Sequence, residues 1–205
     1  SGGTTVSGGI LQGDTTSLKG DIINNAAVVF NQVSEGTYAG IISGTGSVTK
    51  QNAGTLIVKG PNNYSGGTTV SGGTLQGDTT SLKGDIINNA AVVFDQVNEG
   101  TYAGAISGSG SVTKQNTGTL IVKGVSTYTG ATTVSAGTLQ GNTTSLPGNI
   151  LNNAAVVFDQ EIDGTYAGAI SGTGSVTKQN VGTLIVKGPN NYSGGTTVSG
   201  GILQG

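Results

Sequence analysis

The sequence predicts an all-β protein, a parallel β-helix in which short strands wind around a common axis. One observation is a long tandem repeat, because SGGTTVSGG begins at Ser1, Ser65 and Ser193 and returns as TGATTVSAG at Thr129. Another is a shorter period inside each copy, made of β-prone segments that Gly, Asn, Ser and Asp turns separate. A third is that no segment shows the helical periodicity of an amphipathic helix.

These periods predict one continuous β-helix over residues 1–205. It consists of three copies, 1–64, 65–128 and 129–192, and the start of a fourth at 193–205. With three short strands and roughly 21 residues per rung, we expect about ten rungs. Strands in neighbouring rungs lie about 4.8 Å apart, so ten rungs make a rod about 48 Å long.

Three columns of apolar residues are expected to fill the interior. Alternate side chains of a strand point to opposite sides, so one inward residue per strand suffices for a stacked core. The first column follows the valines of recurring triplets: Val6, Val28, Val48, Val70, Val92, Val112, Val134, Val156, Val176 and Val198. The second follows a short polar turn: Leu11, Tyr38, Leu56, Leu75, Tyr102, Leu120, Leu139, Tyr166, Leu184 and Leu203. The third precedes each triplet: Ile23, Ile42, Tyr64, Ile87, Ile106, Tyr128, Leu151, Ile170 and Tyr192.

Glycine and asparagine are expected at the corners between strands. Gly accounts for 39 of the 205 residues and fits corners that need a positive φ. The pair Asn24-Asn25 and its copies Asn88-Asn89 and Asn152-Asn153 are expected to adopt the same conformation and to stack as side-chain ladders. The Gly-rich composition therefore indicates corners of a regular fold.

The composition excludes most enzyme chemistry. The chain has no Cys and no His, and all eight of its positive charges are Lys. It therefore lacks the usual triad base, a thiolate nucleophile, a bidentate phosphate clamp and a Cys/His zinc site. The net charge of −2, with 9% charged residues, gives no electrostatic footprint for nucleic acid or an anionic membrane. We expect no enzymatic activity, no catalytic residues and no cofactor.

Two groups of charged residues are candidate sites. Asp159, Glu161 and Asp163 form the densest carboxylate cluster, and a weak Ca²⁺ site there is the alternative to solvated loop acids. The cluster lacks the GGxGxD loop of calcium-binding β-rolls, so the solvated reading is favoured and no metal is expected. Lys50 and Lys59 recur in every copy and are expected to form a solvated face.

The stretch GSVTKQNAGTLIVKGPNNYSGGTTVSGGTLQG, residues 46–77, resembles the autotransporter-associated β-strand repeat, also described as the passenger-associated transport repeat, of Gram-negative bacterial surface proteins. The pattern of that family is G-S-V-T-K, then G-T-L-x-V, then N-x-Y-S-G-G-T-T-V, then G-T-L-Q-G. All four blocks are present in order. They return at 110–141 with variants and again at 174–205, and they cover about half of each copy.

The resemblance implies an autotransporter passenger: a right-handed parallel β-helix exported through a C-terminal outer-membrane β-barrel. Such a segment is extracellular, on the bacterial cell surface, either anchored or released. In that family the repeat is associated with efficient export and folding of the passenger. The barrel lies outside this sequence, so contact with a membrane is expected only through it. The absence of Cys suits export through a narrow pore, although compositional drift explains it equally well.

We therefore expect a non-enzymatic structural region, a rigid stalk or spacer that aids its own export and folding and displays distal parts of the protein. The alternative is an adhesin that recognises host glycans or proteins. Self-association, end to end or side by side, is a further expectation, because open β-helix ends invite pairing.

Overall fold

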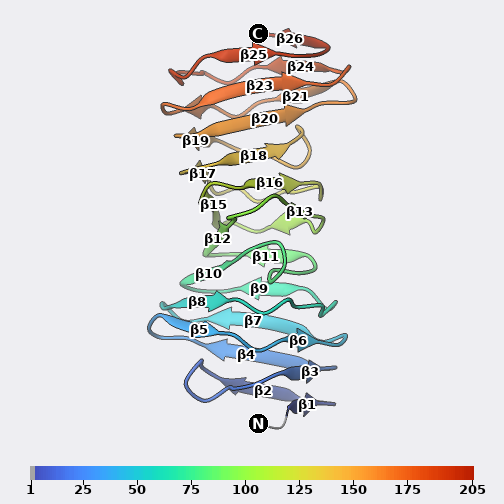
Figure 1. Ribbon diagram of the computed structural model, residues 1–205, viewed down its shortest axis with the longest axis vertical. Coiled ribbons are helices and arrows are strands. Elements are labelled where there is room, and N and C mark those ends of the chain that lie inside the picture. Colours follow the sequence, from blue (N-terminus) through green and yellow to red (C-terminus); the bar gives the residue numbers. More distant parts are fainter. Residues whose placement is uncertain (1–2) are drawn as a thin grey trace.

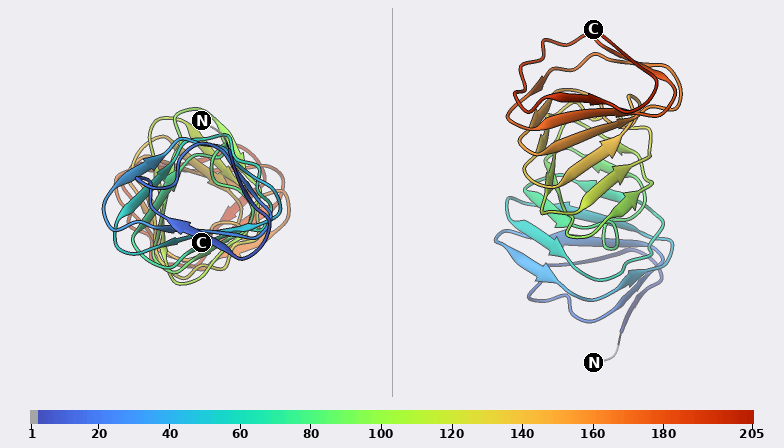
Figure 2. Two further views of the ribbon diagram at one scale, coloured as in Figure 1. Left: turned by 90° about the horizontal axis from the view of Figure 1, so that it is seen from below. Right: turned by 45° about the horizontal axis from the view of Figure 1, so that its top comes forward.

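The computed structural model describes residues 3–205, and every regular element in that range is a β-strand. The strands stack in order from the N-terminal to the C-terminal end of a rod (Figure 1). Seen along the axis, the chain winds around a common centre (Figure 2). Every strand pairing between rungs is parallel, as in β4 (Ala27–Asn31) with β7 (Ser47–Gln51). The fold is a parallel β-solenoid of about ten turns.

The pairing register places each strand on one of three faces. The first face holds β1 (Thr4–Val6), β3 (Ile22–Asn24) and β6 (Ile42–Ser43), then β13 (Gly100–Tyr102), β16 (Thr119–Val122), β18 (Thr138–Gly141), β20 (Ala155–Asp159), β23 (Ser175–Gln179) and β25 (Thr196–Val198). The second holds β2 (Ile10–Gly13), β4, β7, β9 (Thr68–Val70), β11 (Ile86–Asn88) and β14 (Ile106–Ser107), then β21 (Gly164–Tyr166), β24 (Thr183–Val186) and β26 (Ile202–Gln204). The third holds β5 (Gly36–Tyr38), β8 (Thr55–Val58), β10 (Thr74–Gly77), β12 (Ala91–Asp95), β15 (Ser111–Gln115), β17 (Thr132–Val134), β19 (Ile150–Asn152) and β22 (Ile170–Ser171).

Two segments per copy complete a face without forming a strand. In the first copy they are residues 15–18 and 61–64, and their equivalents recur in the other two. Asn62 joins the second of these segments to the rungs on both sides, because its Oδ1 accepts from Ile42 N–H at 2.7 Å and its Nδ2 donates to the Ser81 carbonyl at 2.8 Å. The Asn62 amide thus stands in for a strand pairing, which keeps the first face continuous between β6 and β13.

The rung is shorter than predicted. On the third face, seven steps lead from residue 36 to residue 170, about 19 residues per rung where roughly 21 were expected. Each copy contains eight strands and two segments that form no strand, ten in all, on three faces. Ten is not a multiple of three, so a copy does not close after a whole number of rungs. Equivalent positions of neighbouring copies therefore lie on different faces, whereas each predicted column placed them in one stack.

The predicted columns consequently do not stack as drawn. Val6 pairs with Asn24, Val28 with Leu11 and Val48, and Val70 with Lys50 and Asn88. Members of one predicted column are divided among the three faces, and each true column mixes positions from different parts of the repeat. The number of residues between paired positions of neighbouring rungs also varies, so a constant spacing cannot follow one face. For example, Leu11 and Val28 are closer in sequence than Val28 and Val48.

Two local expectations also need correction. The third column is wrong at Ile23, Ile87 and Leu151, which are exposed. Each of these strands points its first and third residues inward, so the preceding residues, Ile22, Ile86 and Ile150, are buried instead. The Asn pairs do not have positive φ; among described non-glycine residues only Asn52, Asn116 and Asn180 do. Asn24, Asn88 and Asn152 are instead buried and lie on different faces, so they form no ladder with one another.

Candidate functional site

The predicted core residues lie inside the rod except near its ends. Every member of the first two columns is buried apart from three: Leu11 and Leu203 are partly buried and Val198 is 48% exposed. All three belong to the outermost strands of the described chain, β2, β25 and β26, which have a neighbouring rung on one side only. Tyr38 is buried against Phe30 with ring centroids 5.0 Å apart, and its hydroxyl donates to the Gly20 carbonyl at 2.5 Å. Burial, and secondarily the Asp21 charge, raise the pKa of Tyr38 to about 12.

The interior also holds polar side chains, which the sequence did not reveal as a group. Their members recur in each copy: Asn24, Asn88 and Asn152; Gln32, Gln96 and Gln160; Lys50, Lys114 and Lys178. Within residues 3–205, every buried side-chain nitrogen and oxygen has a hydrogen-bond partner. A saturated interior stabilises the fold but leaves no polar atom free to act on a substrate.

The fully buried lysines are the most unusual of these groups. Lys114 Nζ donates to three backbone carbonyls, those of Gln115 at 3.0 Å, Asn116 at 2.6 Å and Ala136 at 3.0 Å. Lys50 and Lys178 repeat this arrangement, and we call the three carbonyls around each ammonium a lysine nest. The nests join one rung to the next, because the third carbonyl comes from the following rung.

Local sequence explains the lysine nest. In the strand SVTKQ, Val112 and Lys114 are two residues apart and both point inward. The carbonyl of Asn116, a residue with φ of 65°, then turns back toward the ammonium. Position 137 is Gly because its φ is 68° and a Cβ there would lie 2.4 Å from the Gly118 carbonyl oxygen, 2.5 Å from that of Asn116 and 2.8 Å from Lys114 Nζ. Burial lowers the pKa of Lys114 and of Lys50 below its ordinary value.

The expectation of a solvated lysine face is therefore wrong for Lys50, while Lys59 is exposed. A Lys two residues after an inward Val in a strand was the signal that places it inside. Its four methylenes pack in the core, and the charge is met by carbonyls at the corner. The lysine nest is a structural site, since its donors and acceptors satisfy one another.

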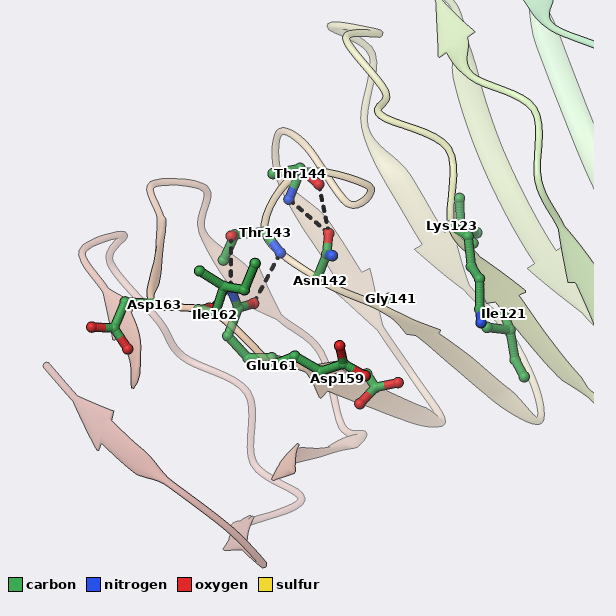
Figure 3. A pocket seen from close by; sticks show the side chains of 12 residues that line it. Ile121, Lys123, Gly141, Asn142, Thr143, Thr144, Asp159, Glu161, Ile162 and Asp163 are labelled. Atoms are coloured by element: carbon green, nitrogen blue, oxygen red, sulfur yellow. Dashed lines mark hydrogen bonds between the residues drawn. The ribbon is translucent and has the colours of Figure 1, made fainter. Parts of the chain in front are cut away.

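A hollow with a volume of about 380 Å³ lies on a corner of the rod. Three successive rungs line it, through residues 121–123, 141–144 and 159–163 (Figure 3). Gln160 closes its inner wall, because its Oε1 accepts from Thr143 N–H at 3.1 Å and its Nε2 donates to the Ile162 carbonyl at 2.6 Å. We call this the corner hollow.

The carboxylates proposed for Ca²⁺ line the corner hollow but do not converge. Asp163 points away from Asp159 and Glu161 (Figure 3). Asp159 accepts hydrogen bonds from Gln140 at 3.1 Å and from Asn180, and Asp163 accepts from Thr183 N–H at 2.6 Å. This backbone hydrogen bond is the main cause that lowers the pKa of Asp163. Among residues 3–205 no group of three or more His, Cys, Asp or Glu side chains is placed to hold a metal ion.

Fold and interior define a class: a repetitive parallel β-solenoid whose buried polar groups serve its own rungs. Passenger-associated-transport-repeat sequences match at residues 1–12, 48–76, 112–140 and 176–204. The chain is 36% identical over 210 residues, 84% of its length, to the Adhesin BmaC autotransporter of Brucella suis biovar 1 (strain 1330). It is 29% identical over 150 residues, 73% of its length, to the Deoxyribonuclease CdiA of Dickeya dadantii (strain 3937).

The chain therefore belongs to the autotransporter passenger regions built from passenger-associated transport repeats, which are displayed outside the bacterial cell. It spans only 6% of the length of the Brucella adhesin and 4% of that of the Dickeya protein. No solved structure gives a significant match. In the described range, no helix is long and apolar enough to cross a membrane.

Proposed function

We propose that this chain is a non-enzymatic stalk or spacer, which aids its own export and folding and carries distal parts of the protein away from the cell. The observation that supports the proposal best is the continuity of pairing. All three faces run through the rod with parallel pairings or bridging side chains. A rod whose rungs each contact only their neighbours has a stability that grows with the number of rungs.

The same pairing supports a role in folding. Each completed rung exposes the edges of its three segments as a template for the next, so folding propagates along the axis. In the lysine nest, the Lys114 ammonium acquires its third carbonyl, that of Ala136, only when the next rung arrives. Internal hydrogen bonds of this kind stabilise each added rung. Growth of the stack outside the cell would draw the remaining chain outward.

Deletion of one whole copy, residues 65–128, in the full-length protein tests the spacer. We expect an epitope tag at the passenger end to lie about 16 Å closer to the membrane per deleted copy, since ten segments on three faces correspond to three and a third rungs. A ladder of deletions and duplications, measured by atomic force microscopy of isolated passengers, gives the slope. Loss of folding after removing one copy would contradict the additive picture.

A second candidate function is adhesion, favoured by the corner hollow. The third copy there replaces Val97, Asn98 and Glu99 of the second by Glu161, Ile162 and Asp163, three consecutive differences between the copies. A glycan array and a cell-adhesion assay with the isolated chain test this function. The control is E161V/I162N/D163E, which restores the loop of the second copy. Binding by the native chain and not by the control would support an adhesin.

A further inference from the structure

The three copies present the same surface loops in different directions. The loop between β4 and β5 is residues 32–35, and its equivalents are 96–99 and 160–163. They connect the second to the third face, the third to the first, and the first to the second, respectively. Each therefore lies at a different corner of the rod. All three carry exposed residues, including Val33 at 72%, Val97 at 59% and Ile162 at 80% exposure.

The register fixes the operation that relates the copies. Strands β1, β9, β17 and β25 are equivalent, and they lie on the first, second, third and again the first face. One copy thus advances three rungs plus one face, which is a rotation of about 120° and a rise of about 16 Å. Three copies, 1–192, restore the original face after ten rungs and about 48 Å.

We infer that the repeat is a threefold screw in which copy number sets the direction of display as well as its height. This inference rests on the proposed spacer. Adding or removing one copy turns everything distal to it by about a third of a full rotation relative to everything proximal. A flat or rigid partner can reach the equivalent loop of every third copy only. Adjacent copies must bind separate partner molecules, each small enough to fit a single corner.

Spin-label distances on the intact chain test this inference, and the absence of Cys permits site-specific labelling. The exposed residues Glu35, Glu99 and Asp163 occupy equivalent positions and are changed pairwise to Cys. For E35C/E99C we expect a distance of about 30 Å between the two labels, since a face is about 20 Å wide, the labels point outward and one copy rises about 16 Å. The pair E99C/D163C should give the same distance. The pair E35C/D163C should give about 40 Å.

The control pair is K59C/S135C. Both residues are exposed and follow the third face at the same corner, four rungs apart, so about 19 Å is expected. A distance of only about 16 Å for E35C/E99C would overturn the screw, because it places the copies directly above one another. Narrow distributions at the wrong distances would refute the screw and leave the rigid spacer standing. Broad distributions for all pairs, including the control, would refute both.

Discussion

Replacement of Lys114 by Met tests the role of the lysine nest. Methionine preserves most of the apolar stem that Lys114 inserts between Phe94 and Val134, its partners on the neighbouring rungs, and removes only the ammonium. The Gln115 carbonyl keeps a second donor, the Gln96 N–H at 3.1 Å. Among the described residues, the Asn116 and Ala136 carbonyls have no donor other than Lys114 Nζ. The variant therefore leaves two carbonyls without a protein partner.

An unsatisfied buried carbonyl costs about 1–3 kcal/mol, and Asn116 lies at an exposed corner where water can replace part of the loss. Removing the ammonium also relieves its desolvation, so we expect a net loss of about 2 kcal/mol, roughly 30-fold in the local opening equilibrium. Amide hydrogen exchange should show this as about 30-fold weaker protection of residues 112–116 and 134–138. The matched control is Lys123→Met, an exposed lysine, for which we expect less than twofold change.

Unchanged or stronger protection in Lys114→Met would refute the reasoning, since desolvation would then outweigh the three hydrogen bonds. The pH dependence gives a second test. Burial lowers the pKa of Lys114, so in the alkaline range below its ordinary value of 10.5 the unfolded chain binds more protons than the folded one. Stability contributed by this residue should rise with pH through that window in the native chain, and the rise should be absent in Lys114→Met.

Three further predictions follow from comparing the copies. Ser126→Asn should stabilise the second copy by about 1 kcal/mol, because the amide can donate to the Ser145 carbonyl as Asn62 does to the Ser81 carbonyl. The reverse change, Asn62→Ser, should destabilise the first copy by the same amount. Urea unfolding measures both, and midpoints equal to that of the native chain would contradict the prediction. Gly110→Ala should lower the free energy of unfolding by about 1–3 kcal/mol, because its Cβ would lie 2.4 Å from Asn88 Oδ1 and 2.5 Å from the Ala90 carbonyl oxygen. The control is Gly8→Ala, whose Cβ would have no atom within 4 Å, and it should leave thermal unfolding unchanged. Asp14 accepts from Thr16 and Ser17, and the Thr16 hydroxyl is the main cause that lowers its pKa to about 2, so its stabilisation is complete above pH 3.8 and fades as pH falls toward 2. Asp14→Asn should abolish this acid transition in an NMR titration of the Thr16 amide and keep the turn, as Asn142 does in the third copy.

The parallel solenoid could be predicted from the sequence, because each rung of such a fold recurs as a repeat of β-prone segments along the chain. Short β-prone segments separated by Gly turns can bury their inward residues only by stacking. The inward direction of most core residues was also readable, since strand alternation has a period of two. The prediction of the inward residue was wrong at Ile23, because Ile22 and Ile23 are both apolar and either one could face the core. Asn24, which is buried, points to the same side as Ile22 and shows which of the two faces inward.

The burial of the three lysines was not predicted, because a charged side chain by itself indicates exposure to solvent. A lone Lys is usually solvated, and no carboxylate partner in the sequence marks Lys50 as buried. Its partners are backbone carbonyls, whose direction depends on the positive φ of Asn52 and on the rung that follows. Such a partner carries no side-chain signal. Only the strand alternation Val48-Thr49-Lys50, which puts Lys50 on the same side as Val48, indicated that Lys50 faces inward.

The screw relation explains why the true columns cannot be read by aligning copies. Along the second face the stacked inward residues are Leu11, Val28, Val48, Thr68, Ile86 and Ile106, which come from six different positions of the repeat. Each inward position must therefore pack against residues from unrelated positions above and below. Aliphatic residues of medium size, and Thr, meet that demand because they differ little in volume. In a solenoid with one rung per copy, identical residues could stack, and large and small side chains could form separate ladders. Here the offset favours inward residues of similar size, and most of the buried hydrophobic residues are Val, Ile and Leu. Each buried Phe pairs with a Tyr of the same rung, while Tyr64 and Tyr128 are buried outside these pairs.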